Sequence, residues 1–268
     1  MLAPSPVVKK IAKEALKKDV LKSMAVGSIF AFVFFIVVLI SSLVDIFANM
    51  IGSIAAMALL IFFAVCPLAL GVFNYFRRLM FDQDDSVLIV FKYFSNISEY
   101  KRAMQFILLM AVRLVAVAAI LYLPCIIVLV LSNESIYSFL NIPLPLWSSN
   151  LWALNSFLSF IATLALVFVM LKYYLAPFIF VSNDEIDPAE ALNMSTIISK
   201  RTGADFFGLA LSFVGWILLS FFVAPIIVTI PYFITSYNVH SQFAITAYNR
   251  DVDRFNENVA PSFSTDEI

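Results

Sequence analysis

The stretch Ile107–Pro124, ILLMAVRLVAVAAILYLP, is apolar enough to cross a membrane except for one residue, Arg113. A helix of about 20 apolar residues spans the roughly 30 Å hydrocarbon core of a bilayer. The whole chain shares this character: 62% of its 268 residues are hydrophobic, 13% are charged, and the mean hydropathy is +0.96. Water-soluble domains carry about 25% charged residues. The sequence therefore predicts an integral membrane protein.

Six segments are expected to cross the membrane as helices, which makes the predicted fold an all-α transmembrane bundle. Four of them are separate apolar runs. The last two divide one run, Phe206–Asn249, that contains no Asp, Glu, Lys or Arg. Because Pro225 and Pro231 lie within this run, it is predicted to turn there. The six expected spans are about 23–44, 50–76, 103–131, 151–176, 206–223 and 226–248.

The basic residues predict the orientation of these spans. The chain has 17 Lys and Arg residues, and all except Arg113 fall in segments that lie on the same side of the expected membrane. These segments are the one before the first span, the one between the second and third, the one from the end of the fourth to the fifth, and the one after the sixth. The positive-inside rule then places both termini and the long basic loops in the cytoplasm. The expected parts are a cytoplasmic basic amphipathic helix at 1–22, a six-span membrane domain at 23–249 and a cytoplasmic polar tail at 250–268.

Three inner segments have the pattern of short helices that lie on the cytoplasmic membrane surface. They are the lysine-rich segment within 1–22, the segment 85–102 and the segment 187–201. The third is expected to begin with Asp187 as its N-cap and to stop near Gly203. Each segment precedes two spans, so one plan occurs three times. This is either a true internal repeat or the general appearance of positive-inside hairpins.

The C-terminal part of the chain resembles a known family. From Lys172 it reads KYYLAPFIFVSNDEIDPAEALNMSTIISKRTGADFFGLALSFVGW, followed by Pro231–Tyr232 and by FAITAY at 243–248. The Lys-aromatic pair, the Ala-Leu-x-x-Ser helix and the Leu-Ser-Phe-x-Gly-Trp span are similar to those of the bacterial multi-pass family called domain of unknown function 975. The opening AKEALKKDVLKSM is similar to its basic first helix. The chain departs from the family at Phe168–Val169, where the family has Pro-Gly, and at VAPIIV, where it has a Gly-rich turn. The resemblance implies six helices and a bacterial cell membrane, and it implies no activity.

Arg113 is the first candidate ligand-binding residue. It lies about 11 residues past Arg102, which at 1.5 Å per residue places it roughly 16 Å into the membrane, near the bilayer centre. Arginine at that depth costs about 2.5–3.5 kcal/mol on insertion scales, and the expected spans contain no Asp or Glu to pair with it. Arg113 is therefore expected to face the bundle interior or a wet cavity. It would be either the counter-charge for an anionic amphiphile or a structural arginine bonded to helix ends.

The remaining candidates are Lys172, Arg77, Arg78 and His240. The first three would form a phosphate pocket at the inner leaflet, or they would be ordinary anchors at the inner membrane boundary. His240 lies in the polar last span, where it either handles protons or is a satisfied interior side chain. No catalytic set, metal-ligand spacing or cofactor motif is recognised, so neither an enzyme nor a cofactor is expected.

These features predict a multi-pass protein of the bacterial cell membrane that binds or moves a lipid-like or anionic amphiphile. The alternative is a non-catalytic scaffold or accessory subunit of a membrane complex, and a membrane enzyme with unrecognised chemistry is the third hypothesis. The expected partners are the lipid bilayer, an anionic lipid and another membrane protein. A net charge of −1 argues against nucleic acid.

Overall fold

The structure is a computed structural model that describes residues 3–47, 50–81, 83, 86–132, 148–219 and 226–259. All regular elements within these ranges are helices. The all-α class predicted from composition is therefore confirmed for the described part of the chain.

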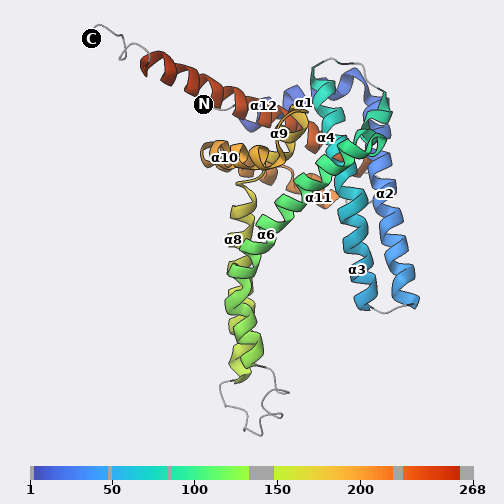
Figure 1. The fold of residues 1–268 in the computed structure, drawn as a ribbon, viewed down its shortest axis with the longest axis vertical. Helices are drawn as coiled ribbons and strands as arrows, with labels where there is room; N and C mark the ends of the chain where they lie inside the picture. The colour runs from blue at the N-terminus through green and yellow to red at the C-terminus, as the bar shows by residue number, and fades with distance from the viewer. Residues whose placement is uncertain are drawn as a thin grey trace.

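Four helical segments are long and apolar enough to cross a membrane, namely Val20–Ile46, Met50–Met80, Ile97–Leu131 and Leu151–Met170. The first lies in α2 (Val20–Phe47), and the second joins α3 (Met50–Leu60), the π-helical turn η1 (Ile61–Val65) and α4 (Cys66–Met80). The third is α6 (Ile97–Leu131), and the fourth lies in α8 (Ser148–Met170). The pairs α2–α3 and α6–α8 form two antiparallel hairpins that point to the same end of the molecule (Figure 1).

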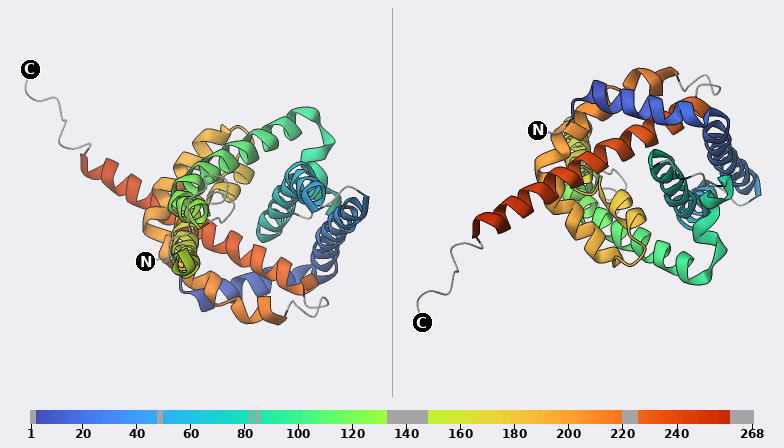
Figure 2. Two further views of the ribbon diagram at one scale, coloured as in Figure 1. Left: turned by 90° about the horizontal axis from the view of Figure 1, so that it is seen from below. Right: turned by 90° about the horizontal axis from the view of Figure 1, so that it is seen from above.

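The other helices gather at the opposite end and lie across the hairpins (Figures 1 and 2). They are α1 (Ser5–Lys18), the short η2 (Val87–Phe91) and α5 (Lys92–Ser95), α9 (Ala176–Ser182), α10 (Pro188–Leu211), α11 (Val214–Leu219) and α12 (Ile226–Val259). We call this set the inner layer. The long α12 packs against α1, α2 and α4, so the last helix of the chain covers the first.

The predicted count of six spans is not confirmed by the described residues. The expected fifth span, 206–223, is divided between the end of α10, a turn at 212–213 and α11, and residues 220–225 lie outside the described ranges. The expected sixth span lies within α12, which runs across the hairpins in Figure 1. Five polar residues in one stretch of α12 make it less apolar than the four spans: Ser236, Asn238, His240, Ser241 and Gln242.

The boundaries of the inner helices differ in part from those expected. Asp187 caps α10 as predicted, because its carboxylate accepts from the backbone N–H of Ala189 at 2.9 Å. The helix does not stop near Gly203, however, but continues to Leu211. Likewise α12 continues as a helix through Val259, beyond the start of the expected polar tail, and residues 260–268 lie outside the described ranges.

The apolar core lies where the hairpins meet the inner layer. One cluster surrounds α9 and includes Phe106, Tyr174 and Phe180, and two smaller clusters join α2 to α4 and α1 to α12. A very close contact fixes η2 on α4, since a Cβ atom at Gly71 would lie 1.8 Å from the carbonyl oxygen of Val90. Only glycine fits at that position.

Candidate functional site

A groove lies where α1, the start of α2, α11 and α12 meet, and we call it the α1–α12 groove. Its volume is about 280 Å³, close to the lower end of the roughly 300–1,000 Å³ range of small-molecule pockets. Its walls are mostly apolar and include Met24, Trp216 and Val228, all of which are exposed. An exposed apolar surface of this kind fits an apolar ligand or the tail of an amphiphile.

Two lysines stand on the wall that α1 contributes. Lys13 and Lys17 are four residues apart, so they lie on the same face of the helix, and both are exposed. Within the described ranges neither has an anionic or hydrogen-bonding partner. The groove therefore combines apolar walls with two unpaired positive charges.

The floor of the groove contains a polar spot. The Ser23 side chain is 2% exposed, and its Oγ has no hydrogen-bond partner among the described residues. Nearby, α2 and α12 approach closely, because a Cβ at Gly27 would lie 2.8 Å from the carbonyl oxygen of Ile227. That carbonyl has no helical donor four residues on, where Pro231 lacks an N–H.

The groove lies at the start of the first apolar span. That span, Val20–Ile46, has 27 residues, whereas the hydrocarbon core takes about 20. If the core were counted from Ile46 it would end near Gly27, and Val20, Ser23 and Met24 would then extend beyond it, toward α1.

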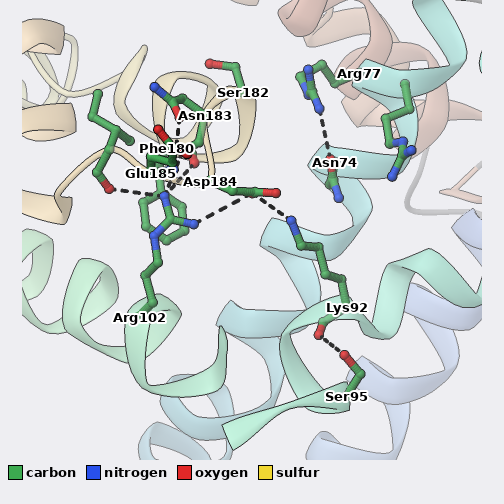
Figure 3. A network of polar contacts seen from close by, with 12 residues as sticks. Asn74, Arg77, Lys92, Ser95, Arg102, Phe180, Ser182, Asn183, Asp184 and Glu185 are labelled. Atoms are coloured by element: carbon green, nitrogen blue, oxygen red, sulfur yellow. Dashed lines mark hydrogen bonds and ion pairs between the residues drawn. The ribbon is translucent and has the colours of Figure 1, made fainter. Parts of the chain in front are cut away.

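A second polar region, the Arg102 network, joins α6 to the loop between α9 and α10 (Figure 3). The Arg102 guanidinium donates to the carbonyl oxygens of Asn183 at 2.7 Å, Ile186 at 3.1 Å and Phe180 at 3.5 Å. Asp184 lies 3.7 Å from Arg102 and accepts from Lys92 at 2.7 Å. The guanidinium also stacks 4.4 Å above the Phe180 ring. Every charged group in this network has a protein partner, so the network is a structural joint.

A third polar cluster lies inside the inner layer around Tyr174. Its hydroxyl donates to Thr202 at 2.7 Å and lies 3.3 Å from Nε2 of His240, while Tyr237 donates to the Tyr174 carbonyl. Phe206 stacks on the Tyr174 ring at 4.2 Å. Burial lowers the pKa of His240 and raises the pKa of Tyr174, because it disfavours the charged form of each. His240 is 1% exposed, and its Nε2 lies against the Tyr174 hydroxyl.

Arg113 lies at the middle of the third span, Ile97–Leu131. Tyr122 Oη and Thr163 Oγ1 are 2.7 Å apart and fix the register of α6 on α8. Arg113 precedes Tyr122 by nine residues, or about 14 Å, so it lies about level with the end of the fourth span, at Met170. The side chain is half-buried and has no polar partner among the described residues. Its predicted depth near the bilayer centre and its predicted role as a counter-charge both stay predictions.

The structure does not bring the remaining predicted residues together in the groove. The Lys172 side chain is exposed in the turn after α8, and its carbonyl accepts from Ser195 and Ser199 at 3.0 and 2.9 Å. Arg77 and Arg78 end α4 and donate to Asn74 at 3.4 Å and Gln83 at 3.0 Å, respectively. None of these basic residues lines the groove.

Sequence reasoning missed the two groove lysines and Arg102 as individual residues. The four-residue spacing of Lys13 and Lys17 directly before an apolar run was a usable signal. Nothing in the sequence indicated that Trp216 and Val228, about 200 residues later, would complete the same groove.

Comparison with known proteins yields one match. The model of the family described as "Protein of unknown function (DUF975)" matches residues 2–246, which includes the N-terminal half. No curated protein matches the chain. No solved structure matches it either.

Proposed function

The chain belongs to the DUF975 family of proteins of unknown function, and we propose that it is a non-catalytic membrane protein that binds an anionic amphiphile in the α1–α12 groove. The observation that carries the proposal is the combination of apolar walls with two lysines that have no partner in the described part of the chain, at one end of a span. Apolar surface favours a hydrocarbon tail by about 25 cal/mol per Å² buried. Each lysine near an anionic membrane surface contributes about 1 kcal/mol of attraction.

The groove supports binding better than catalysis. Among the described residues of its lining, the polar side chains are Lys13, Lys17, Ser23, Trp216 and Tyr232. These supply positive charge, hydroxyl groups and an indole N–H, but no carboxylate or imidazole to act as a general base. Retention or presentation of an amphiphile is therefore the function that fits these residues.

The proposed setting is the cytoplasmic membrane of a bacterium, with four spans and the inner layer on the cytoplasmic side. The two connections at the far end of the hairpins, 48–49 and 133–147, contain no Lys or Arg. Apart from Arg113, all basic residues lie toward the inner layer, which is the distribution the positive-inside rule favours. We expect a Ser135→Cys variant to react with a thiol reagent added from the outside. We expect an Asn258→Cys variant to react only after the cells are permeabilised. The reverse pattern would contradict this orientation.

The binding test compares two charge-matched double variants. We expect Lys13→Gln/Lys17→Gln to weaken the binding of phosphatidylglycerol by roughly tenfold or more, because two cationic contacts are removed. The control, Lys10→Gln/Lys200→Gln, removes two exposed lysines that do not line the groove. Native mass spectrometry of the purified proteins with added phosphatidylglycerol measures both. Equal binding by the two variants would overturn the proposal.

A further inference from the structure

We propose that the ligand of the α1–α12 groove is an ester-linked glycerophospholipid, whose phosphate lies at Lys13 and Lys17 and whose ester carbonyl accepts a hydrogen bond from the Ser23 hydroxyl. The inference rests on the proposed function and goes further, since it distinguishes among anionic amphiphiles.

Ser23 is the residue that selects the class of ligand. A buried hydroxyl without a partner is unfavourable, and Ser23 is 2% exposed, belongs to the groove lining and has no partner for its hydroxyl among the described residues. A ligand with a hydrogen-bond acceptor at this depth would remove that cost. A purely apolar tail would leave it in place.

The order of groups along the groove matches that of a glycerophospholipid. Lys13 and Lys17 belong to α1, which ends at Lys18, and Ser23 lies one turn into α2. The two helices are separated by Asp19, and Ser23 therefore lies on the bilayer side of the lysines. In a glycerophospholipid the ester carbonyls likewise lie between the phosphate and the acyl chains. A fatty acid has its charge and its only acceptors in one carboxylate, so it cannot serve the lysines and Ser23 at separate levels.

The apolar walls and small size of the groove suit part of one acyl chain rather than two chains. The walls beyond Ser23 are the apolar side chains of Met24, Trp216 and Val228. At about 280 Å³ the groove is at the small end of ligand pockets, so the second chain of a diacyl lipid would remain in the bilayer. Met24 and Val228 are exposed, which leaves the groove open on that side.

Trp216 provides a reporter within the groove. The chain contains three tryptophans, and a Trp147→Phe/Trp152→Phe background would leave Trp216 as the sole tryptophan, whose emission can be excited selectively at the red edge of its absorption. Phosphatidylglycerol with bromine atoms on one acyl chain quenches a tryptophan that it contacts. The ether-linked counterpart has the same charge and chains but lacks the ester carbonyls, so the comparison isolates the proposed hydrogen bond.

In this full-length background we expect the ester lipid to bind about fivefold more tightly than the ether lipid, which corresponds to one hydrogen bond of about 1 kcal/mol. In Ser23→Ala the ratio should fall to about one. Equal binding of both lipids to the Ser23 protein would overturn the glycerophospholipid inference and leave amphiphile binding intact. Absence of quenching by either lipid, together with no effect of Lys13→Gln/Lys17→Gln, would overturn both proposals. Because the ester-to-ether ratio is measured first with Ser23 present, the test holds even if Ser23→Ala folds poorly.

Discussion

The Arg102 network and the α1–α12 groove both place cations beside apolar surface at the inner end of the molecule, yet their charges are used differently. Arg102 is bound by three carbonyl groups and one carboxylate, and its side chain is 16% exposed. Lys13 and Lys17 are exposed and have no partner within the described ranges. Cations that are bound by groups of the protein stabilise the fold, whereas cations beside an apolar groove that lack such partners are available to a ligand.

The largest expected effect concerns the contact that holds η2, and with it Lys92, against α4. Gly71→Ala would place a Cβ 1.8 Å from the Val90 carbonyl oxygen, so η2 must move and the protein should lose about 3 kcal/mol of stability or more. Thermal unfolding followed by fluorescence-detected gel filtration measures this loss. Gly208→Ala is the control, since a Cβ there meets nothing within 4 Å. A wild-type midpoint for Gly71→Ala would contradict the close packing of η2.

The next effect is the loss of the Arg102 network itself. Arg102→Ala strands the carbonyl groups of the α9–α10 loop and leaves Asp184 with Lys92 alone, which should cost about 2–4 kcal/mol. The exposed neighbour Lys101→Ala should change stability by less than about 0.5 kcal/mol. The denaturation midpoints of both variants measure these two changes in stability. The comparison between the two regions fails if Arg102→Ala is as stable as Lys101→Ala.

A smaller effect is expected at the floor of the groove. Gly27→Ala would place a Cβ 2.8 Å from the Ile227 carbonyl oxygen and 3.0 Å from Pro231 Cγ. Moving α2 away from α12 should cost about 1–3 kcal/mol and should also weaken phosphatidylglycerol binding. Gly215→Ala in α11, with open space around it, should change neither quantity. Retention of full binding by a destabilised Gly27→Ala would show that the floor does not shape the ligand site.

The smallest effect on stability should come from the groove lysines, although they matter most for binding. Lys13→Gln/Lys17→Gln should unfold within about 0.5 kcal/mol of wild type in detergent without lipid. Added phosphatidylglycerol should raise the midpoint of wild type and of Arg102→Ala, because a ligand that binds only the folded state stabilises it. The lysine variant should show no such rise. If added phosphatidylglycerol raised the unfolding midpoint of the lysine variant as much as that of wild type, the proposed role of Lys13 and Lys17 in binding would be contradicted.

The sequence was sufficient to predict the four strongly apolar spans, the basic first helix and the Asp187 cap, because each depends on local hydropathy or capping. It could not decide between four and six spans. Removing the last two spans leaves all charged segments on the same side, so the positive-inside rule is satisfied either way. The polar residues of α12 are the feature that bears on the sixth predicted span, since buried groups such as Asn238 and His240 fit a helix packed on protein better than one in lipid.

The site was less predictable than the fold because it depends on contacts between distant segments. Arg113 is recognisable in the sequence as a charge in an apolar run. Its height relative to α8, however, follows from the Tyr122–Thr163 hydrogen bond, which only the structure provides. Gly203 looked like a helix terminator, but it is buried on α10 near the Leu171 carbonyl, and this packing outweighs the local preference. Arg102 gave no signal, because its partners are backbone carbonyls about 80 residues away.

The position of α12 over α1 has a consequence for biosynthesis. The helix α12 covers α1 but is synthesised about 200 residues after it, so the apolar face of the amphipathic α1 is unprotected or rests on lipid until α12 has been made. The two hairpins can enter the bilayer one after the other in the meantime. The inner layer, and with it the groove, can close only after α12 has been made, so a product terminated before α12 would be inserted in the membrane and still lack the groove.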